Sequence, residues 1–217
     1  MAEWLCSGLQ IRLGRFDSGL RLQTQHLAPL QYHPPAHSFW SFSAPPSAGD
    51  LEQYWLLRPG ALTAGLRKLG DVKLRVVTEH KEHLTPAEAW MLQRPAGAAI
   101  WVREIIMAIN GHDSVFARSF TPLDASTNQW KGIRQLQTRP LADMLYHDPD
   151  IVRSRFVTCQ LTHEEPIARS LQAALGVQAN DNPAIFARAS AFYRDAQPLL
   201  VAECFLPAFW GMAKREI

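Results

Sequence analysis

An Asn-Gly pair at residues 110–111 constrains the fold of this chain more than any other feature of the sequence. The apolar run from Ile100 to Ile109 precedes the pair, and the run from Val115 to Thr121 follows it. Asn-Gly is favoured in two-residue turns between antiparallel strands, because both residues tolerate a positive φ angle. We therefore predict a β-hairpin here, and with it an antiparallel sheet.

A second hairpin and several helices complete the predicted fold. The runs from Ile185 to Arg194 and from Leu199 to Leu206 flank a turn at Asp195-Ala196. Two more strands are predicted, VKLRVVTEH at 72–80 and IVRSRFVTCQLT at 151–162. Helical segments are predicted at 51–57, 61–69, 86–92, 140–148 and 166–175, with Pro, Gly or Thr residues at their ends. Six strands with inserted helices indicate an α+β fold, a single antiparallel sheet with helices on one face.

The first fifty residues differ in composition from the rest. The segment QYHPPAHSFWSFSAPPSAGD, residues 31–50, is rich in Pro, Ser and His and has neither a helical nor a strand period. We therefore expect a partly irregular N-terminal arm over residues 1–50, followed by one domain over residues 51–217.

Charged residues stand inside the most apolar strands. Glu203 lies in PLLVAECFLP, and Arg103 and Glu104 lie in IWVREIIMAI. Side chains alternate between the two faces of a strand, so Glu203 shares its face with Leu199, Val201 and Phe205. A charge in an apolar interior needs a partner, because an unpaired buried ion costs several kcal/mol.

Two explanations for these charges remain open at this point. In the first, Arg103 forms a buried salt bridge with Glu203, and Glu104 pairs with Arg118 across the hairpin. In the second, the charges line a mostly apolar ligand pocket, the usual form of small-molecule sites. An arginine in such a pocket suits a carboxylate, and a glutamate suits a hydroxyl or a proton transfer.

Composition narrows the class of protein. The chain has 217 residues, 47% of them hydrophobic, with 22 basic against 20 acidic residues. This balance gives no electrostatic reason to expect a nucleic-acid or membrane partner. Three widely spaced cysteines and no run of about 18 apolar residues favour a cytoplasmic protein without disulfides or membrane helices. We expect a monomer that binds small molecules.

Four blocks of sequence resemble the chorismate lyase family, in the same order along the chain. They are WLLRPGALT, IWVREIIMAINGHDSVFARSFTP, RPLADMLY and IFARASAFYRDAQPLLVAECFLP. The resemblance runs from about Tyr54 to Pro207. It implies an enzyme that cleaves chorismate to 4-hydroxybenzoate and pyruvate, on the route to ubiquinone, in a buried site on an antiparallel sheet.

The resemblance also implies roles for particular residues. Arg103 matches the family arginine that holds the ring carboxylate, and Glu203 matches the glutamate that meets the ring hydroxyl. Leu62 and Leu141 match two backbone contacts to the ligand. The second carboxylate of chorismate would fall to Arg188 or Arg118. The reaction needs neither a metal nor a redox cofactor, because aromatisation of the ring drives it.

The sequence leaves two questions open. Glu203 either only orients the hydroxyl or also moves a proton. The same fold serves as the ligand-sensing half of bacterial transcription regulators, so a non-catalytic binding domain is the alternative function. The leading fifty residues are too few and too proline-rich for the DNA-binding domain that such regulators carry, which favours the enzyme. A relative that has lost turnover is a third possibility.

Overall fold

The fold is described from a computed structural model, in which residues 33–35, 38–176 and 184–214 are placed well enough to describe. Most of the predicted arm, residues 1–32, lies outside the described residues, so the domain boundary at residue 50 stays a prediction. None of the described helices is both long and apolar enough to cross a membrane.

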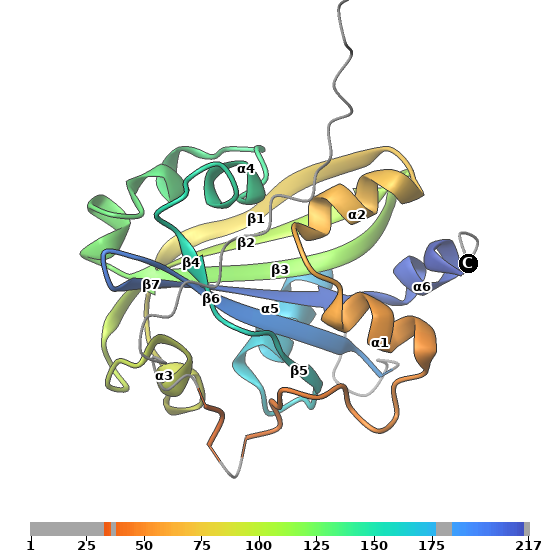
Figure 1. The fold of residues 1–217 in the computed structure, drawn as a ribbon, viewed down its shortest axis with the longest axis horizontal. Coiled ribbons are helices and arrows are strands. Elements are labelled where there is room, and N and C mark those ends of the chain that lie inside the picture. Colours follow the sequence, from red (N-terminus) through yellow and green to blue (C-terminus); the bar gives the residue numbers. More distant parts are fainter. Residues whose placement is uncertain (1–32, 36–37, 177–183, 215–217) are drawn as a thin grey trace, which may run out of the picture.

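One antiparallel sheet of seven described strands forms the centre of the molecule (Figure 1). Six strands lie in the order β1-β2-β3-β7-β6-β4, and β5 also pairs with β6. The strands are β1 (Val72–His83), β2 (Ala99–Ile109), β3 (His112–Pro122), β4 (Val152–Arg153), β5 (Val157–Gln160), β6 (Phe186–Arg194) and β7 (Gln197–Phe205). The predicted α+β fold around an antiparallel sheet is confirmed, with one strand more than expected.

Both predicted hairpins are present, and their turns have the expected backbone. Asn110 and Gly111 join β2 to β3 with φ angles of 49° and 83°. Asp195 and Ala196 join β6 to β7 with φ angles of 49° and 59°. Two successive residues at positive φ give the turn a twist that matches the flanking strands. These turns fix which residues of the paired strands lie opposite each other.

The single strand predicted over residues 151–162 is wrong, because this segment forms two short strands, β4 and β5. Between them Ser154 Oγ accepts a hydrogen bond from the backbone N–H of Ala191, at 2.9 Å. The side chain thus takes the place of a carbonyl in the ladder with β6, and the strand is interrupted there. Because of the interruption, Arg153 and Phe156 lie on the same face of the sheet.

The prediction that helices cover one face of the sheet is also wrong, because helices lie on both faces (Figure 1). The central strands bury side chains on both sides, and each apolar face needs a covering layer. The helices are α1 (Asp50–Leu57), α2 (Leu62–Leu69), α3 (Pro86–Leu92), α4 (Ala142–Leu145), α5 (Pro166–Leu175) and α6 (Pro207–Ala213), with 3₁₀ helices η1 (Ala125–Thr127) and η2 (Lys131–Gln135).

We name the two faces by what covers them. The closed face carries α3 and α5 over one large apolar cluster that includes Phe116. The cavity face carries the other helices over two separate clusters. One of these contains Leu66 and Phe209, and the other contains Trp130 and Leu145. Because the two clusters do not merge, space is left between them.

The described end of the predicted arm packs on the closed face. Trp40 is only 3% exposed and belongs to the closed-face cluster. Its indole Nε1 donates to Glu165 at 3.3 Å, and Ser41 forms a β-bridge with Thr158 of β5. Residues around position 40 therefore pack against the sheet.

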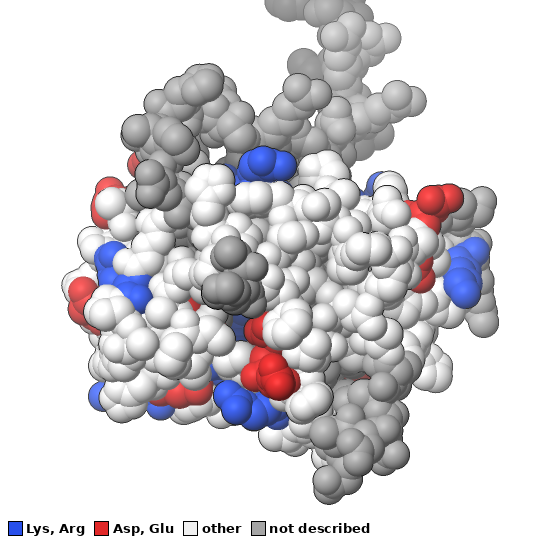
Figure 2. Space-filling view, turned by 90° about the horizontal axis from the view of Figure 1, so that it is seen from below, with Lys and Arg blue, Asp and Glu red and all other residues white. Residues whose placement is uncertain are grey.

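Charges on the molecular surface are mixed. Figure 2 shows one face of the molecule, on which basic and acidic side chains are interspersed among uncharged ones. On that face the pattern agrees with the near balance of 22 basic and 20 acidic residues in the whole sequence.

Candidate functional site

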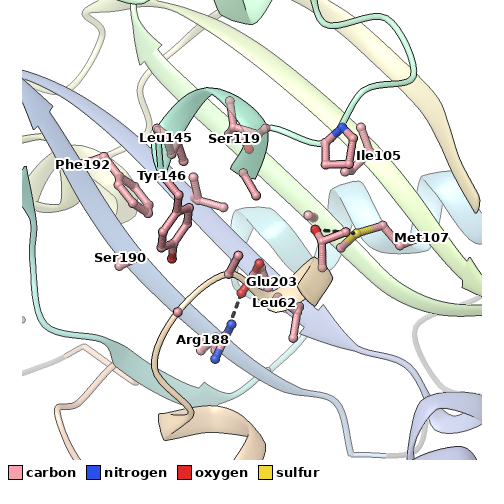
Figure 3. A pocket seen from close by; sticks show the side chains of 18 of the residues that line it. Leu62, Ile105, Met107, Ser119, Leu145, Tyr146, Arg188, Ser190, Phe192 and Glu203 are labelled. Atoms are coloured by element: carbon pink, nitrogen blue, oxygen red, sulfur yellow. Dashed lines mark hydrogen bonds and ion pairs between the residues drawn. The ribbon is translucent and has the colours of Figure 1, made fainter. Parts of the chain in front are cut away.

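A cavity lies between the two apolar clusters of the cavity face (Figure 3). About 540 Å³ of space separates its lining atoms, part of it open to solvent. Most of the wall is apolar and is formed by Leu62, Leu74, Ile105, Met107, Ala117, Leu141, Leu145, Phe156, Phe192 and Val201. Polar groups enter from Thr63, Ser119, Tyr146, Arg153, Arg188, Ser190 and Glu203. Apolar walls with a few placed polar groups are the usual form of a small-molecule site.

An ion pair between Arg188 of β6 and Glu203 of β7 lines this cavity (Figure 3). The two residues are direct cross-strand neighbours, and Arg188 Nε donates to Glu203 Oε2 at 2.7 Å. Arg188 Nη1 also donates to the carbonyls of Trp55 and Arg58, each at 3.0 Å. These carbonyls lie at the end of α1, where backbone acceptors lack partners within the helix. The pair is thus fixed by both the sheet and α1.

A second arginine, Arg153, enters the cavity from β4. Its Nη1 donates to the Tyr146 hydroxyl at 2.8 Å and lies 3.5 Å from the carbonyl oxygen of Gly60. Its guanidinium carbon lies 4.1 Å from the ring centre of Phe156, and that of Arg188 lies 4.4 Å from the same ring. One phenylalanine therefore contacts both guanidinium groups, an attractive cation–π arrangement.

Tyr146 follows α4 and reaches into the cavity, with its hydroxyl directed toward the Arg188–Glu203 pair (Figure 3). Burial raises the pKa of Tyr146; the charge on Glu203 raises it further, and Arg153 offsets part of the change. The phenol therefore stays protonated at neutral pH. Its oxygen accepts from Arg153, and its own proton has no acceptor among the described residues.

Leu62 and Leu141 line the cavity, and each stands at the start of a helix. Leu62 is the first residue of α2, and Leu141 directly precedes α4. The first backbone N–H groups of a helix have no partner within the helix, and a negative charge is favoured beside them. Two such helix starts therefore lie in the same cavity wall.

Arg103 lies on the cavity face of β2 but is not among the residues that line the cavity. Its Nε donates to Glu79 at 2.9 Å, and its Nη2 donates to the carbonyl of Gln137 at 2.5 Å and approaches that of Arg139 at 3.4 Å. Burial lowers the pKa of Arg103, and Glu79 offsets only part of this. The expectation of a salt bridge between Arg103 and Glu203 is wrong, because each has another partner.

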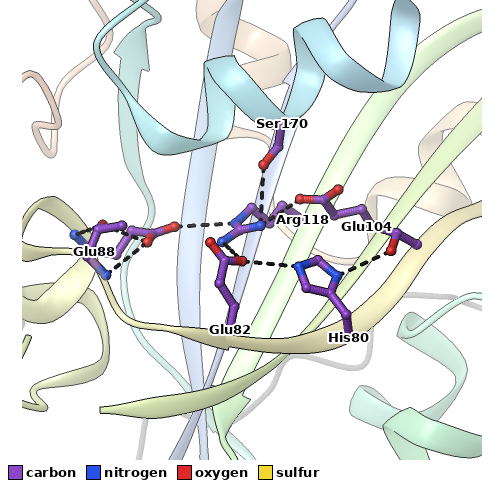
Figure 4. Close-up of polar contacts among 8 residues, drawn as sticks. His80, Glu82, Glu88, Glu104, Arg118 and Ser170 are labelled. Atoms are coloured by element: carbon purple, nitrogen blue, oxygen red, sulfur yellow. Dashed lines mark hydrogen bonds and ion pairs between the residues drawn. The ribbon is translucent and has the colours of Figure 1, made fainter. Parts of the chain in front are cut away.

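Arg118 lies on the closed face, away from the cavity (Figure 4). Each of its nitrogens has an acceptor: Nε has Glu88 at 3.3 Å, Nη1 has Glu104 at 2.6 Å and Nη2 has Glu82 at 2.8 Å. Burial alone would lower the pKa of Arg118, but the three carboxylates raise it. The predicted Glu104–Arg118 pair is confirmed. The expectation that Arg118 binds a substrate carboxylate is wrong for this cavity, because Arg118 lies on the other face of the sheet.

The cavity also contains residues that sequence reasoning missed, above all Tyr146, Arg153 and Phe156. They come from a one-turn helix and an interrupted strand, neither of which has a periodic pattern. The pairing of Arg188 with Glu203, by contrast, had a signal. A two-residue turn at Asp195-Ala196 sets the register of β6 and β7 and puts these two residues opposite each other.

Comparison with known proteins gives matches over most of the chain. The sequence model of the family described as chorismate lyase matches residues 40–215, beginning inside the predicted arm. The probable chorismate pyruvate-lyase of Bordetella pertussis is 52% identical over 178 residues, which are 82% of this chain and 93% of that protein. A probable chorismate pyruvate-lyase 1 of Pseudomonas entomophila is 34% identical over 179 residues, with 82% and 95% covered.

Solved structures share the fold at low sequence identity. The effector domain of PhnF from Mycobacterium smegmatis has a TM-score of 0.50 and 18% identity, with 69% of this chain and 90% of that chain covered. A second PhnF structure has a TM-score of 0.51 and 18% identity, with 70% and 66% covered. At this identity the similarity shows the fold alone.

Proposed function

Because the chain belongs to the chorismate lyase family, we propose that it eliminates pyruvate from chorismate and releases 4-hydroxybenzoate for ubiquinone synthesis. The observation that carries the proposal is the Arg188–Glu203 pair in a cavity with apolar walls. We further propose that the protein acts in the cytoplasm, as a monomer, without a metal or redox cofactor.

The proposed pose uses both ends of the cavity. The ring hydroxyl lies at Glu203, and the apolar wall that includes Ile105 and Met107 contacts the ring. The ring carboxylate lies at the other end, beside the start of α4 at Leu141, while Leu62 lies beside Glu203. Support for this end comes from the start of α4, because the first N–H groups of a helix lack partners within the helix and favour an anion. The pose gives each polar group of the ring a complementary partner.

The chemistry follows from the substrate. The bond between the ring and the ether oxygen breaks, and the ring carbon that bears the hydroxyl loses its proton. The enolpyruvyl arm takes up a proton on its methylene carbon and leaves as pyruvate. The ring becomes aromatic, so the protein needs only to hold the arm in a reactive pose and exclude water.

Glu203 lies beside the reacting carbon in this pose. Its carboxylate accepts the hydroxyl proton in a hydrogen bond, and the carbon that loses a proton is the one that bears this hydroxyl. Orientation of the hydroxyl and transfer of the ring proton are both consistent with this position. Glutamine keeps the size of the side chain and removes its basicity, so Glu203→Gln tests the second role.

Arg103 is proposed to hold the ring carboxylate once substrate is bound. Its strand neighbour across the sheet, Ser119, lines the cavity, so the side chain begins close to this end. Without ligand, Nη2 donates to the carbonyls of Gln137 and Arg139, just before the cavity wall at Pro140. In the proposed complex the carboxylate oxygens replace these carbonyls, which couples binding to the position of that wall.

The test is to add chorismate to the purified protein and quantify 4-hydroxybenzoate and pyruvate by chromatography. We expect equal amounts of both products from the wild type, and a loss of about 10²-fold or more in kcat for Glu203→Gln. Retained binding of 4-hydroxybenzoate by the variant would show that the fold and the cavity are intact.

Two results would contradict the proposal in different ways. Tight binding of 4-hydroxybenzoate without any turnover would support the alternative of a non-catalytic binding domain with this fold. Neither binding nor turnover would mean that the Arg188–Glu203 pair stabilises the fold and does nothing more.

A further inference from the structure

Arg153 differs from the other buried arginines in its partners. Arg103, Arg118 and Arg188 each donate to at least one glutamate. Of the charged residues that line the cavity, Arg153 alone has no carboxylate partner within the described part of the chain. It is half-buried, beside apolar and aromatic side chains, where a charge without a counter-ion is unfavourable. A ligand carboxylate would supply the missing counter-ion.

The side chain is already held for this role. Contacts with the Tyr146 hydroxyl and the Gly60 carbonyl use a single nitrogen, Nη1, while stacking on Phe156 fixes the plane of the guanidinium. Among the described residues, Nε and Nη2 have no hydrogen-bond partner. These two nitrogens form one edge of the guanidinium, which donates two parallel hydrogen bonds to a carboxylate.

The charge balance in the cavity also favours a ligand carboxylate at Arg153. Arg188 and Glu203 neutralise each other, so Arg153 leaves one positive charge in excess. Chorismate carries two carboxylates, and the proposed pose uses only the one on the ring. The enolpyruvyl arm is attached next to the hydroxyl-bearing carbon, so its carboxylate lies at the Glu203 end. Tyr146 contacts Arg153 directly and is directed toward Glu203, so all three belong to this end.

We propose that Arg153 binds the carboxylate of the enolpyruvyl arm and that Tyr146 is the positioning residue that aims it. This inference rests on the proposed function. It replaces the expectation that Arg188 or Arg118 takes this carboxylate. Arg188 already donates to Glu203 and two carbonyls, and Arg118 lies on the other face of the sheet. Arg153 therefore distinguishes chorismate, which has the arm, from 4-hydroxybenzoate, which does not.

The experiment compares the two ligands in Arg153→Gln. We measure kcat and KM for chorismate and the Kd for 4-hydroxybenzoate by calorimetry. Loss of a bidentate charged contact should raise the KM for chorismate by about 10–10²-fold. The Kd for 4-hydroxybenzoate should change by less than about threefold, because the product has no arm. Tyr146→Phe should raise the KM for chorismate by about tenfold or less, with the same selectivity for the arm.

Arg155→Gln is the matched control. Arg155 lies two residues away, is exposed, and stacks on Phe42 at 4.6 Å without lining the cavity. Its KM and Kd should equal those of the wild type. If Arg153→Gln fails to fold, Arg153→Lys keeps the charge without the fork and should still raise the KM selectively.

The outcomes separate this inference from the proposed function. A wild-type protein that makes no product and binds no chorismate would overturn both. An active wild type with an unchanged KM in Arg153→Gln would overturn only the role of Arg153. If Arg153→Gln weakened the binding of chorismate and of 4-hydroxybenzoate equally, the role of Arg153 would also be overturned. Arg153 would then act on the ring or on the shape of the cavity.

Discussion

Arg118 and Arg188 lie on opposite faces of the same sheet and are equally buried, with 2% and 1% of their side chains exposed. Their surroundings differ in charge. Arg118 has three glutamates, and every one of its nitrogens has an acceptor (Figure 4). Arg188 has one glutamate and two carbonyls, and it shares Phe156 with Arg153, which has no glutamate at all.

The difference indicates which arginines serve the fold and which serve a ligand. A buried cation whose donors are all used by the protein holds elements together and has nothing left to offer a substrate. Arg118 does this for β1, β3 and α3 on the closed face. A buried cation with unused donors beside a cavity is unfavourable unless a ligand supplies a counter-ion and hydrogen-bond acceptors. On the cavity face, that partner is the proposed substrate.

The largest expected effect on folding is that of Arg118→Met. It leaves Glu88 and Glu104 buried without their cation, and removal of one partner of a buried ion cluster costs about 3–5 kcal/mol. We expect a loss of this size in the free energy of unfolding, measured with urea, while the KM for chorismate of the folded fraction stays unchanged. Arg75→Met is the control: the Arg75–Asp113 pair is exposed, and its loss should cost less than about 1 kcal/mol. Equal costs for the two variants would contradict a special role of the closed-face cluster.

Arg188→Met should change both folding and activity. It removes the partner of Glu203 and the donor to the end of α1, which should lower the free energy of unfolding by about 2–3 kcal/mol. It should also lower kcat/KM by about 10²-fold, because Glu203 loses its orientation and its charge balance. Unfolding curves and turnover are measured on the same preparation. A loss of stability with normal turnover would make Arg188 equivalent to Arg118 and would remove the contrast between the faces.

Features of the fold that depend on neighbouring residues could be predicted from the sequence better than contacts between distant segments. Period two gave the correct face for Glu203, because side-chain alternation needs only a continuous strand. The register of β6 and β7 was also contained in the sequence, in their two-residue turn. The Glu104–Arg118 pair across β2 and β3 was predicted, but the shift in register between Met107 and Ala108 was not. A bulge of this kind has no reliable sequence signature here.

Contacts between distant segments could not be predicted. Arg103 finds Glu79 because β1 lies beside β2, and it finds the carbonyl of Gln137 because a long irregular segment folds over the sheet. Arg153 lies opposite Phe192 of β6 and therefore faces the same cavity, and this pairing joins segments about 40 residues apart. The number of layers was misjudged for a related reason, since strands that are apolar on both faces were expected to have helices on one. Such strands require cover on both faces.

Arg103→Lys sharpens the comparison within the cavity. A lysine retains the charge but cannot donate to Glu79 and to two carbonyls at once, so the wall at Pro140 loses support. We expect kcat/KM for chorismate to fall about tenfold and the affinity for 4-hydroxybenzoate to fall by a similar factor, since both carry the ring carboxylate. This pattern is opposite to that expected for Arg153→Gln. If only kcat/KM for chorismate fell and the affinity for 4-hydroxybenzoate did not, Arg103 would not bind the ring carboxylate.

The smallest expected effect concerns excess negative charge on the closed face. Burial raises the pKa of Glu165 above its ordinary value of 4.5, Trp40 offsets part of the change, and the charges of Glu88 and Glu164 add to it. The folded state thus holds a proton more tightly than the unfolded state. The stability that this proton gives is fully present below the unfolded pKa and is lost as the pH rises through the folded pKa.

Glu165→Gln carries no such charge and keeps an acceptor for Trp40, so it should be more stable than the wild type at pH 7.5. Urea unfolding at pH 7.5 and 4.5 checks this, and the advantage should shrink at the lower pH. An advantage that grows as the pH falls would mean that Glu165 is stabilised as an anion, and that the closed face needs more negative charge than its three glutamates around Arg118 provide.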